Sequence, residues 1–492
     1  MQFLYLRTIG VLSFTLSLAS SLFGQDTLVL HLEGVLTLAI EQSIELKIAQ
    51  SETTEQDAAF QNANLEFRPQ LFFNGTFPNL NRSIESRPLP NGSDAFVNRA
   101  TMYNGLGFNL NYHLEKIGGL FSLGTSIERL DVFKSDQSDY QRTYFANLFN
   151  VNYIQPFFTF NERRWQKERL SLLNLEFKQR YARKREEIII QAISYFKNCF
   201  LSYERLRLAR RQIVETDTLL AIKKRLFDIG KSTRTEILRL NLNQRNNEQN
   251  ERTELYNWKQ AQLELIDFLG LDRNKVILLI EPGSFQTTNI SIDQAMYLAV
   301  NNNHIKAAQK RMLREAESNL ERARKDKDIR LDLNLSLGLN NSANNLDDLW
   351  NPILDREIFS ASIKLPVTGW QKYKLRQQIA EEQIEQVTLQ QDKERINLSQ
   401  EAFKLVSNFE FLKLSLVNIE ERRKGANEIL QVISQQFLQG QASYTDFNVA
   451  LREREQITLE YFNTLLAIIE QYYQIRSLCM YDFELGKALT EE

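Results

Sequence analysis

Cysteine, histidine and proline are all scarce in this sequence. Only two cysteines occur among 492 residues, and Cys199 and Cys479 both fall within helical patterns, so we expect buried free thiols and no disulfide framework. The three histidines are scattered, and no His/Cys/acid cluster has the spacing of metal ligands. No phosphate-binding glycine loop or nucleophile motif occurs either. We therefore expect no enzyme, no metal and no cofactor.

A strong net charge and long apolar runs are lacking as well. The formal net charge of -2 gives no basic field, so we expect no nucleic-acid partner. After residue 25, no apolar run reaches the ~18 residues that a transmembrane helix needs. Residues 1–25 combine Arg7, an apolar stretch from Ile9 to Leu18 and small residues up to Gly24. This pattern predicts a secretory signal peptide that is cleaved near Gly24 or Gln25.

Proline is confined to a few places, and the segments 157–281 and 367–492 contain none. Both segments are rich in Leu, Ile, Glu, Gln, Lys and Arg, which favour helices. Apolar residues in the second segment follow a 4-3 spacing that is typical of coiled-coil packing, as in Leu405, Phe409, Leu412, Leu416 and Ile419. An uninterrupted helix from residue 161 to residue 226 would be roughly 100 Å long. Such a helix needs neighbours along its whole length.

The proline-free segments contain two related turns. Phe227-Asp-Ile-Gly230-Lys-Ser-Thr-Arg-Thr-Glu236 and Phe437-Leu-Gln-Gly440-Gln-Ala-Ser-Tyr-Thr-Asp446 lie 210 residues apart. In each, glycine suits the left-handed end of one helix, and the following Ser or Thr can cap the next. Pro156 and Pro366, which end strand-like runs and mark strand-to-helix turns, are also 210 residues apart. The chain is therefore predicted to be a duplication.

Each copy also contains strand-like alternation. Leucines at odd positions from 331 to 339 alternate with polar residues, and a second run ends at Pro366. In the first copy, the strand-like runs 68–77 and 145–155 bracket an extra hairpin at about 104–131, and we expect loops at 79–103 and 131–143. The extra hairpin could enlarge a barrel or lie over its mouth, and we favour the second arrangement. A soluble sheet with one wet face remains the alternative to a membrane barrel.

These patterns predict a mostly α protein with a membrane β-barrel portion. The expected parts are a signal peptide (1–25), a periplasmic helix (26–66), barrel strands of the first repeat (67–157), a long helical hairpin (158–270), a linker and helix (271–328), barrel strands of the second repeat (329–367) and a second long helical hairpin (368–492). The strands of one chain are too few to close a barrel, and sheet edges cannot face lipid. We therefore expect cyclic oligomers.

The ordered set of motifs resembles the outer membrane efflux (TolC-like) family. It consists of the two Phe-x-x-Gly turns, Gln155-Pro156-Phe157-Phe158, Leu365-Pro366-Val367 and Phe268-Leu-Gly-Leu271. The resemblance implies a homotrimer in the bacterial outer membrane, with a twelve-stranded barrel on a helical tunnel in the periplasm. It also implies a passive exit duct of a tripartite efflux pump or type I secretion system. The hairpin tips at Gly230 and Gly440 would dock to a periplasmic adaptor, which joins an inner-membrane transporter.

The resemblance also indicates where the tunnel narrows. Asp446 matches a carboxylate that forms a ring on the trimer axis, and Glu236 matches the acid of the first hairpin. The alternative is that both are ordinary first-turn acids, favourable to the helix dipole. The aromatic and basic gate partners would fall on Phe437 and Ala442, which lack the hydroxyl and the charge, so Arg234 or Tyr444 could substitute.

Some alternatives stay open at this point. The polar run from Asn241 to Asn250 could be a solvated helix face or could line a water channel. The main alternative function is a secreted coiled-coil structural or adhesion protein, and a periplasmic adaptor is a second. The transported cargo is not indicated by any motif.

Overall fold

The computed structural model describes residues 27–489, apart from 89–91, 135–138, 231, 284–287, 304, 352 and 440. The predicted signal peptide and its cleavage site lie outside the described residues. The chain folds into two compact units, each assembled from three separate segments. One unit comprises the described residues within 1–43, 188–287 and 409–473, and the other comprises those within 44–187, 288–408 and 474–492.

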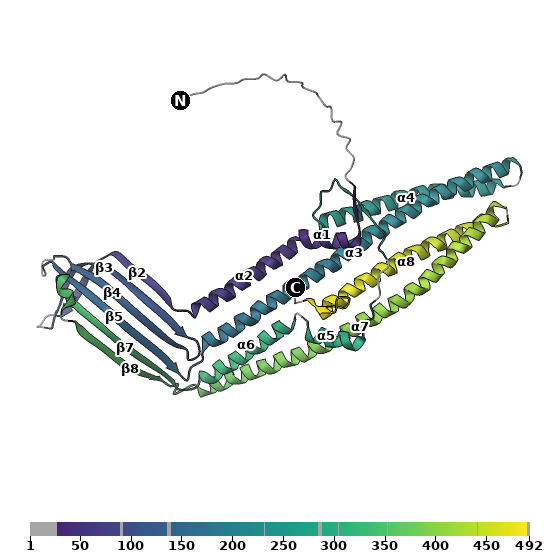
Figure 1. Ribbon diagram of the computed structural model, residues 1–492. Helices are drawn as coiled ribbons and strands as arrows, with labels where there is room; N and C mark the ends of the chain where they lie inside the picture. The colour runs from purple at the N-terminus through teal and green to yellow at the C-terminus, as the bar shows by residue number, and fades with distance from the viewer. Residues whose placement is uncertain are drawn as a thin grey trace, which may run out of the picture. The chain divides into compact units, whose positions relative to one another are not determined.

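The second of these units contains a six-stranded antiparallel sheet. Its strands are β2 (Gln70–Pro88), β3 (Asp94–Leu114), β4 (Gly119–Val132), β5 (Gln141–Phe157), β7 (Arg330–Ala343) and β8 (Leu354–Lys364), in the spatial order β2-β3-β4-β5-β7-β8. Strands β2 and β8 are its two edges (Figure 1). Within the described residues the sheet is open, because these edges do not pair with each other.

The sheet corrects two expectations. The extra hairpin does not lie over a mouth, because β3 and β4 pair in register between β2 and β5. The segment 79–103 is not simply a loop, because residues 79–88 pair with residues 94–103 as the outer halves of β2 and β3. These outer halves have little apolar alternation, and their backbone ladder is supplemented by an ion pair of 3.1 Å between Arg99 and Glu85.

Helices continue from the sheet in the same unit. α2 (Ile44–Glu66) precedes β2, β5 leads into α3 (Glu162–Asp228), α6 (Ile305–Lys325) precedes β7, and β8 leads into α7 (Trp370–Leu438). Polar contacts link these helices in the row α2-α3-α6-α7: Lys178–Asp57 (3.3 Å), Arg311–Glu176 (2.7 Å) and Arg324–Glu381 (3.6 Å). The short helix α5 (Ile292–Asn301), a 3-10 turn (Asp347–Trp350) and the terminal strands β9 (Tyr481–Asp482) and β10 (Lys487–Ala488) complete the unit.

The other unit is built around two helical hairpins. The distal part of α3 turns into α4 (Arg234–Phe268), and the distal part of α7 turns into α8 (Tyr444–Cys479). Buried aromatic residues join α3 to α8. The rings of Phe200 and Phe462 pack edge to face, with their centroids 5.2 Å apart. The unit also holds α1 (Leu32–Gln42) and a parallel pair, β1 (Thr27–Leu30) with β6 (Val276–Leu279). The sequence reasoning missed this pair and expected one helix where α1 and α2 are separate.

The duplication is visible in the helix boundaries. α3 and α7 end at Asp228 and Leu438, and α4 and α8 begin at Arg234 and Tyr444, so the 210-residue offset of the sequence is kept. Cys199 and Cys479 are buried and free, as expected. No helix in the described part of the chain is long and apolar enough to cross a membrane.

Candidate functional site at the hairpin tips

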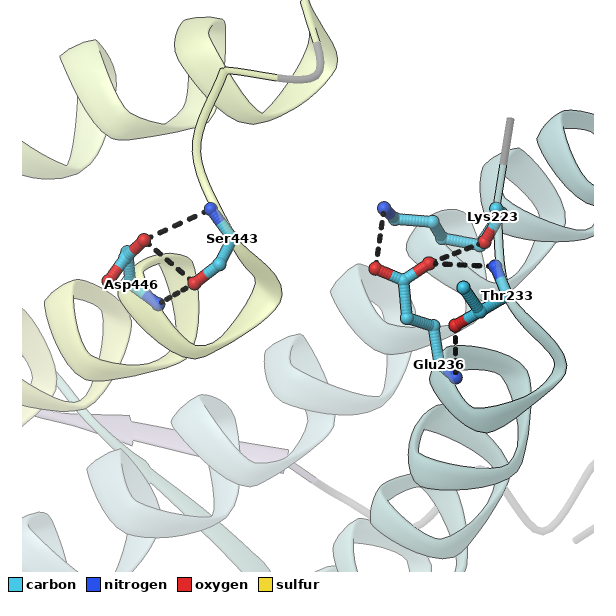
Figure 2. Close-up of polar contacts among 6 residues, drawn as sticks. Lys223, Thr233, Glu236, Ser443 and Asp446 are labelled. Atoms are coloured by element: carbon cyan, nitrogen blue, oxygen red, sulfur yellow. Dashed lines mark hydrogen bonds and ion pairs between the residues drawn. The ribbon is translucent and has the colours of Figure 1, made fainter.

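The tip of the first hairpin is a tight turn followed by a capped helix. Gly230 has a φ of +74°, the left-handed conformation that glycine adopts without a steric penalty. Thr233 then caps α4, because its hydroxyl oxygen accepts a hydrogen bond from the backbone N–H of Glu236 (3.3 Å). The Glu236 carboxylate in turn accepts from the Thr233 backbone N–H (3.2 Å), which completes a capping box (Figure 2).

Glu236 has further partners at this tip. Ser232 donates its hydroxyl to Glu236 Oε2 (2.6 Å), and the Lys223 ammonium lies 3.5 Å from Glu236 Oε1. The hydrogen bond from Ser232 is the largest cause that lowers the pKa of Glu236, with further lowering from the Thr233 N–H and from Lys223. Glu236 is therefore held as a carboxylate. Lys223 was not identified from the sequence, because it lies in the preceding helix, away from the repeated motif.

The second tip repeats this arrangement. Ser443 donates both its backbone N–H (3.0 Å) and its hydroxyl (2.7 Å) to Asp446 Oδ2, and the Asp446 backbone N–H donates to the Ser443 hydroxyl oxygen (3.2 Å) (Figure 2). These hydrogen bonds, with the one from the Ser443 hydroxyl the largest cause, lower the pKa of the exposed Asp446 carboxyl. Gly440 lies outside the described residues. Both predicted gate acids thus occupy the same position, the third residue of a capped helix.

The other predicted gate residues, Phe437, Tyr444 and Arg234, differ in their burial and in their contacts. Phe437 is buried and packs against Phe447 with ring centroids 5.6 Å apart, so it is part of the apolar core of the tips. Tyr444 is half-buried, and its hydroxyl oxygen accepts hydrogen bonds from Asn243 Nδ2 (2.6 Å) and Asn448 Nδ2 (2.7 Å). Arg234 is exposed. Of the two proposed substitutes, Tyr444 therefore joins the two hairpins through Asn243.

The polar run of α4 has a role that the sequence did not indicate. Gln244 donates to Asp217 (2.6 Å), Asn247 donates to Thr216 (2.9 Å), and a third contact joins Glu251 to Arg210 at 3.1 Å. These side chains form a polar seam between α4 and α3. Part of the polar run therefore forms contacts between α4 and α3. This role differs from both alternatives drawn from the sequence, a solvated helix face and the lining of a water channel.

The predicted strand-to-helix turns lie in the unit that contains the sheet. Pro366 falls between β8 and α7, as expected. Pro156 is still within β5 and pairs with Asp332, so the first turn comes two residues later than predicted, where Phe158 has a φ of 61°. No group of three or more potential metal ligands occurs among the residues that the structure describes.

One face of the sheet is apolar and exposed. The row Leu71–Leu110–Leu123–Val151–Leu337 crosses five strands in register. Leu71, Leu123 and Leu337 expose 66%, 38% and 53% of their surface, which is far more than a soluble sheet leaves to water on its apolar face. The opposite face carries the row Asn111–Ser122–Asn152–Ser336. Such alternation fits a sheet with lipid on one side and water on the other.

The fold formed by the amphipathic sheet and the elongated helices is similar to that of several solved outer-membrane channels. The solved structure of CusC matches with a TM-score of 0.62 at 13% identity, over 91% of this chain and 91% of that one. The outer-membrane channel OprN matches with a TM-score of 0.64 at 11% identity, over 92% and 90% of the two chains. The CmeC outer membrane channel of Campylobacter jejuni matches with a TM-score of 0.62 at 14% identity, over 91% and 85%.

A family match agrees with the fold. Residues 297–479, which comprise most of the second repeat, match the model of the outer membrane efflux protein family. No curated protein sequence matches the chain. The resemblance found in the sequence is therefore confirmed over this stretch, and the fold of most of the chain is similar to that of the solved outer-membrane channels.

Proposed function

We propose that this chain is one protomer of a homotrimeric duct that closes a β-barrel in the outer membrane and carries cargo passively from the periplasm to the exterior. Its hairpin tips dock to a periplasmic adaptor, which couples the duct to an inner-membrane transporter. The duct itself performs no catalysis. The cargo enters at the tips and leaves through the barrel.

The open sheet is the observation that carries this proposal. β2 and β8 each pair on one side only, yet the sheet has a continuous exposed apolar face. In lipid, an unpaired strand edge leaves backbone groups without hydrogen bonds and costs several kcal/mol per group. Pairing β2 of one protomer with β8 of the next removes both edges. Cyclic symmetry closes the ring with one repeated contact.

We also propose that Asp446 and Glu236 form a gate at the periplasmic entrance, and this proposal rests on their positions at the two hairpin tips. Asp446 is exposed and ionised beside the start of α8, and Glu236 occupies the matching place on α4. In a trimer whose tips converge, three Asp446 carboxylates would form a ring that attracts cations. The cap hydrogen bonds hold each carboxylate at a fixed place on its helix, which suits a selectivity ring as well as a helix start.

Membrane fractionation followed by bilayer recording tests the function. The mature protein is expected in the outer-membrane fraction as a heat-modifiable trimer, and the purified trimer is expected to give discrete conductance steps in a planar bilayer. A secreted structural or adhesion protein would give oligomers without conductance. A water-soluble monomer would overturn the proposal altogether.

A further inference from the structure

The extra hairpin is an integral part of the sheet. β3 and β4 pair without interruption from Thr101 opposite Val132 to Leu114 opposite Gly119. The turn between them is fixed to the segment that starts α3, because Asn161 Nδ2 donates to the Glu115 carbonyl (2.8 Å) and Lys167 forms a 2.8 Å ion pair with the Glu115 side chain. Gln155 Nε2 also donates to the carbonyl of Ile117, at 2.8 Å. The hairpin of β3 and β4 therefore lies between β2, which follows α2, and β5, which leads into α3.

The polar face of this enlarged sheet carries a hollow. Glycines stand on it where strands approach closely: a Cβ at Gly107 would lie 2.9 Å from the Thr125 carbonyl, and one at Gly338 would lie 2.9 Å from that of Phe149. The pairing also shifts register at three places, between β2 and β3, β4 and β5, and β5 and β7, and such bulges bend a sheet. The resulting hollow of about 270 Å³ is lined mainly by Asn, Thr, Ser and Gly residues of β2 to β5.

The width of six strands also matches the row of helices that joins the sheet. At a spacing of about 4.8 Å and a tilt of about 40°, six strands cover roughly 38 Å of a barrel's circumference. The four helices α2, α3, α6 and α7, packed about 8–10 Å apart, cover roughly 32–40 Å. Four strands would cover only about 25 Å by the same measure. Strands β3 and β4 thus bring the sheet to the width of its helices.

We propose that the trimer closes an eighteen-stranded barrel, wider than the twelve-stranded barrel that the resemblance implies, and that its exit passes bulky hydrated polymers. This inference rests on the proposed trimeric duct. Three six-stranded sheets give a backbone diameter of about 36 Å, compared with about 24 Å for twelve strands. Side chains that extend about 5 Å inward from each wall leave a free width of roughly 25 Å in place of roughly 14 Å.

The lining suits such a cargo. The inward-facing side chains of the strands' regular part are mostly amides, hydroxyls and glycines, as in the rows Asn111–Ser122–Asn152–Ser336 and Asn74–Gly107–Ser126–Asn147. Neutral polar groups can exchange hydrogen bonds with a hydrated chain without holding it by charge. The exit is therefore suited to polypeptide or polysaccharide segments, and we expect it to select little between ions.

Polymer exclusion measured from the barrel side tests this proposal. Polyethylene glycols of graded size, whose hydrodynamic diameters bracket the two widths, are added to the barrel side of a bilayer that contains the intact trimer. Polymers of intermediate size are expected to enter and change the conductance. Deletion of residues 94–132 removes β3 and β4 and leaves β2 followed by β5, which is still an antiparallel succession. The deleted trimer is expected to exclude those intermediate polymers.

Electron cryomicroscopy of the intact trimer supplies a second measurement, which does not depend on the folding of the deletion variant. Eighteen strands in the barrel wall support the proposal. A conducting trimer with twelve strands in its wall, or one that excludes the intermediate polymers, overturns the proposal and leaves the duct function standing. If the intact chain forms no conducting trimer, the proposed duct function is overturned, and this inference is overturned with it.

Discussion

Glu455 of α8 is a carboxyl group enclosed within the helical hairpins. It exposes 6% of its surface and accepts a hydrogen bond from Gln212 of α3. Burial is the largest effect on this group and raises its pKa to about 7, while Gln212 and Arg454 act against the rise and Glu215 adds to it. Arg454 lies at 3.7 Å and Arg211 also faces the group. Desolvation therefore outweighs the nearby cations here.

This raised pKa predicts a pH dependence of stability. Below the ordinary carboxyl pKa of 4.5 both folded and unfolded forms carry the proton. Between 4.5 and about 7 only the folded form keeps it, so Glu455 lowers the stability progressively as the pH rises through this window, and no further above it. The thermal midpoint of the helical signal, followed by circular dichroism, is expected to fall from pH 5 to pH 8.

The matched control is the neighbouring exposed Glu453. Glu455→Gln should flatten the pH dependence, because an amide does not titrate, whereas Glu453→Gln should leave it as in the natural protein. If Glu455→Gln shows the same slope as the natural protein, the buried carboxyl is not the group responsible.

At the scale of the element, the two helix starts combine a cap with a charge. The Ser443–Asp446 pair holds the start of α8 through three hydrogen bonds, so loss of the Ser443 hydroxyl should cost about 1 kcal/mol. The charge of Asp446 is a separate property. If three such charges ring the entrance, their removal alters ion selectivity, whereas loss of the cap alone does not.

Two variants separate these roles. Asp446→Asn removes the charge and is expected to move the reversal potential in a salt gradient towards zero. Ser443→Ala keeps the charge and is expected to lower the thermal midpoint with no change in reversal potential. Glu236→Gln offers the same comparison at the first tip, because glutamine at this position preserves a capping box. An unchanged reversal potential in both charge variants would assign the acids to helix capping alone.

The elements differ in how well their sequences predicted them. The long helices were predictable because proline is absent and the apolar seam persists, and the 210-residue offset is kept at both tips. The outer halves of β2 and β3 were missed because residues such as Asn79, Ser83 and Asn98 give no alternation of apolar and polar side chains. Their pairing is seen only in the backbone ladder of the structure. Asn243 was missed at the tips because its partner Tyr444 is distant in sequence, and Lys223 was missed because it lies outside the repeated motif that contains Glu236.

At the scale of the whole molecule, the two repeats supply unequal shares of the sheet. The first repeat provides four strands and the second provides two. In the first repeat β2 follows α2 and β5 precedes α3, and in the second repeat β7 follows α6 and β8 precedes α7. The duplication explains those four, and β3 with β4 is an insertion in one copy only. The two edges that must meet between protomers are thus β2 of the first repeat and β8 of the second.

Paired cysteines test this contact between protomers. Asn74 of β2 faces the polar side of the sheet, as do Ile358, Ser360 and Ser362 of β8, so Asn74→Cys is combined in turn with a cysteine at each of the three. A disulfide needs Cβ atoms about 3.5–4.5 Å apart, so we expect one combination to form covalent trimers on a non-reducing gel. The two native thiols should not interfere, because burial raises the pKa of Cys199 and Cys479 to about 12.

The control exploits the alternation of side chains along a strand. Ala361 lies next to Ser360 and Ser362 but points to the opposite face, so Asn74→Cys with Ala361→Cys should not cross-link even when the edges are paired. Cross-linking by a polar-face pair and not by this pair places β2 beside β8 of the neighbouring protomer, because no other arrangement brings those faces together at bonding distance. If every combination stays monomeric in membranes, the two edges do not meet, and the barrel must close by some other contact.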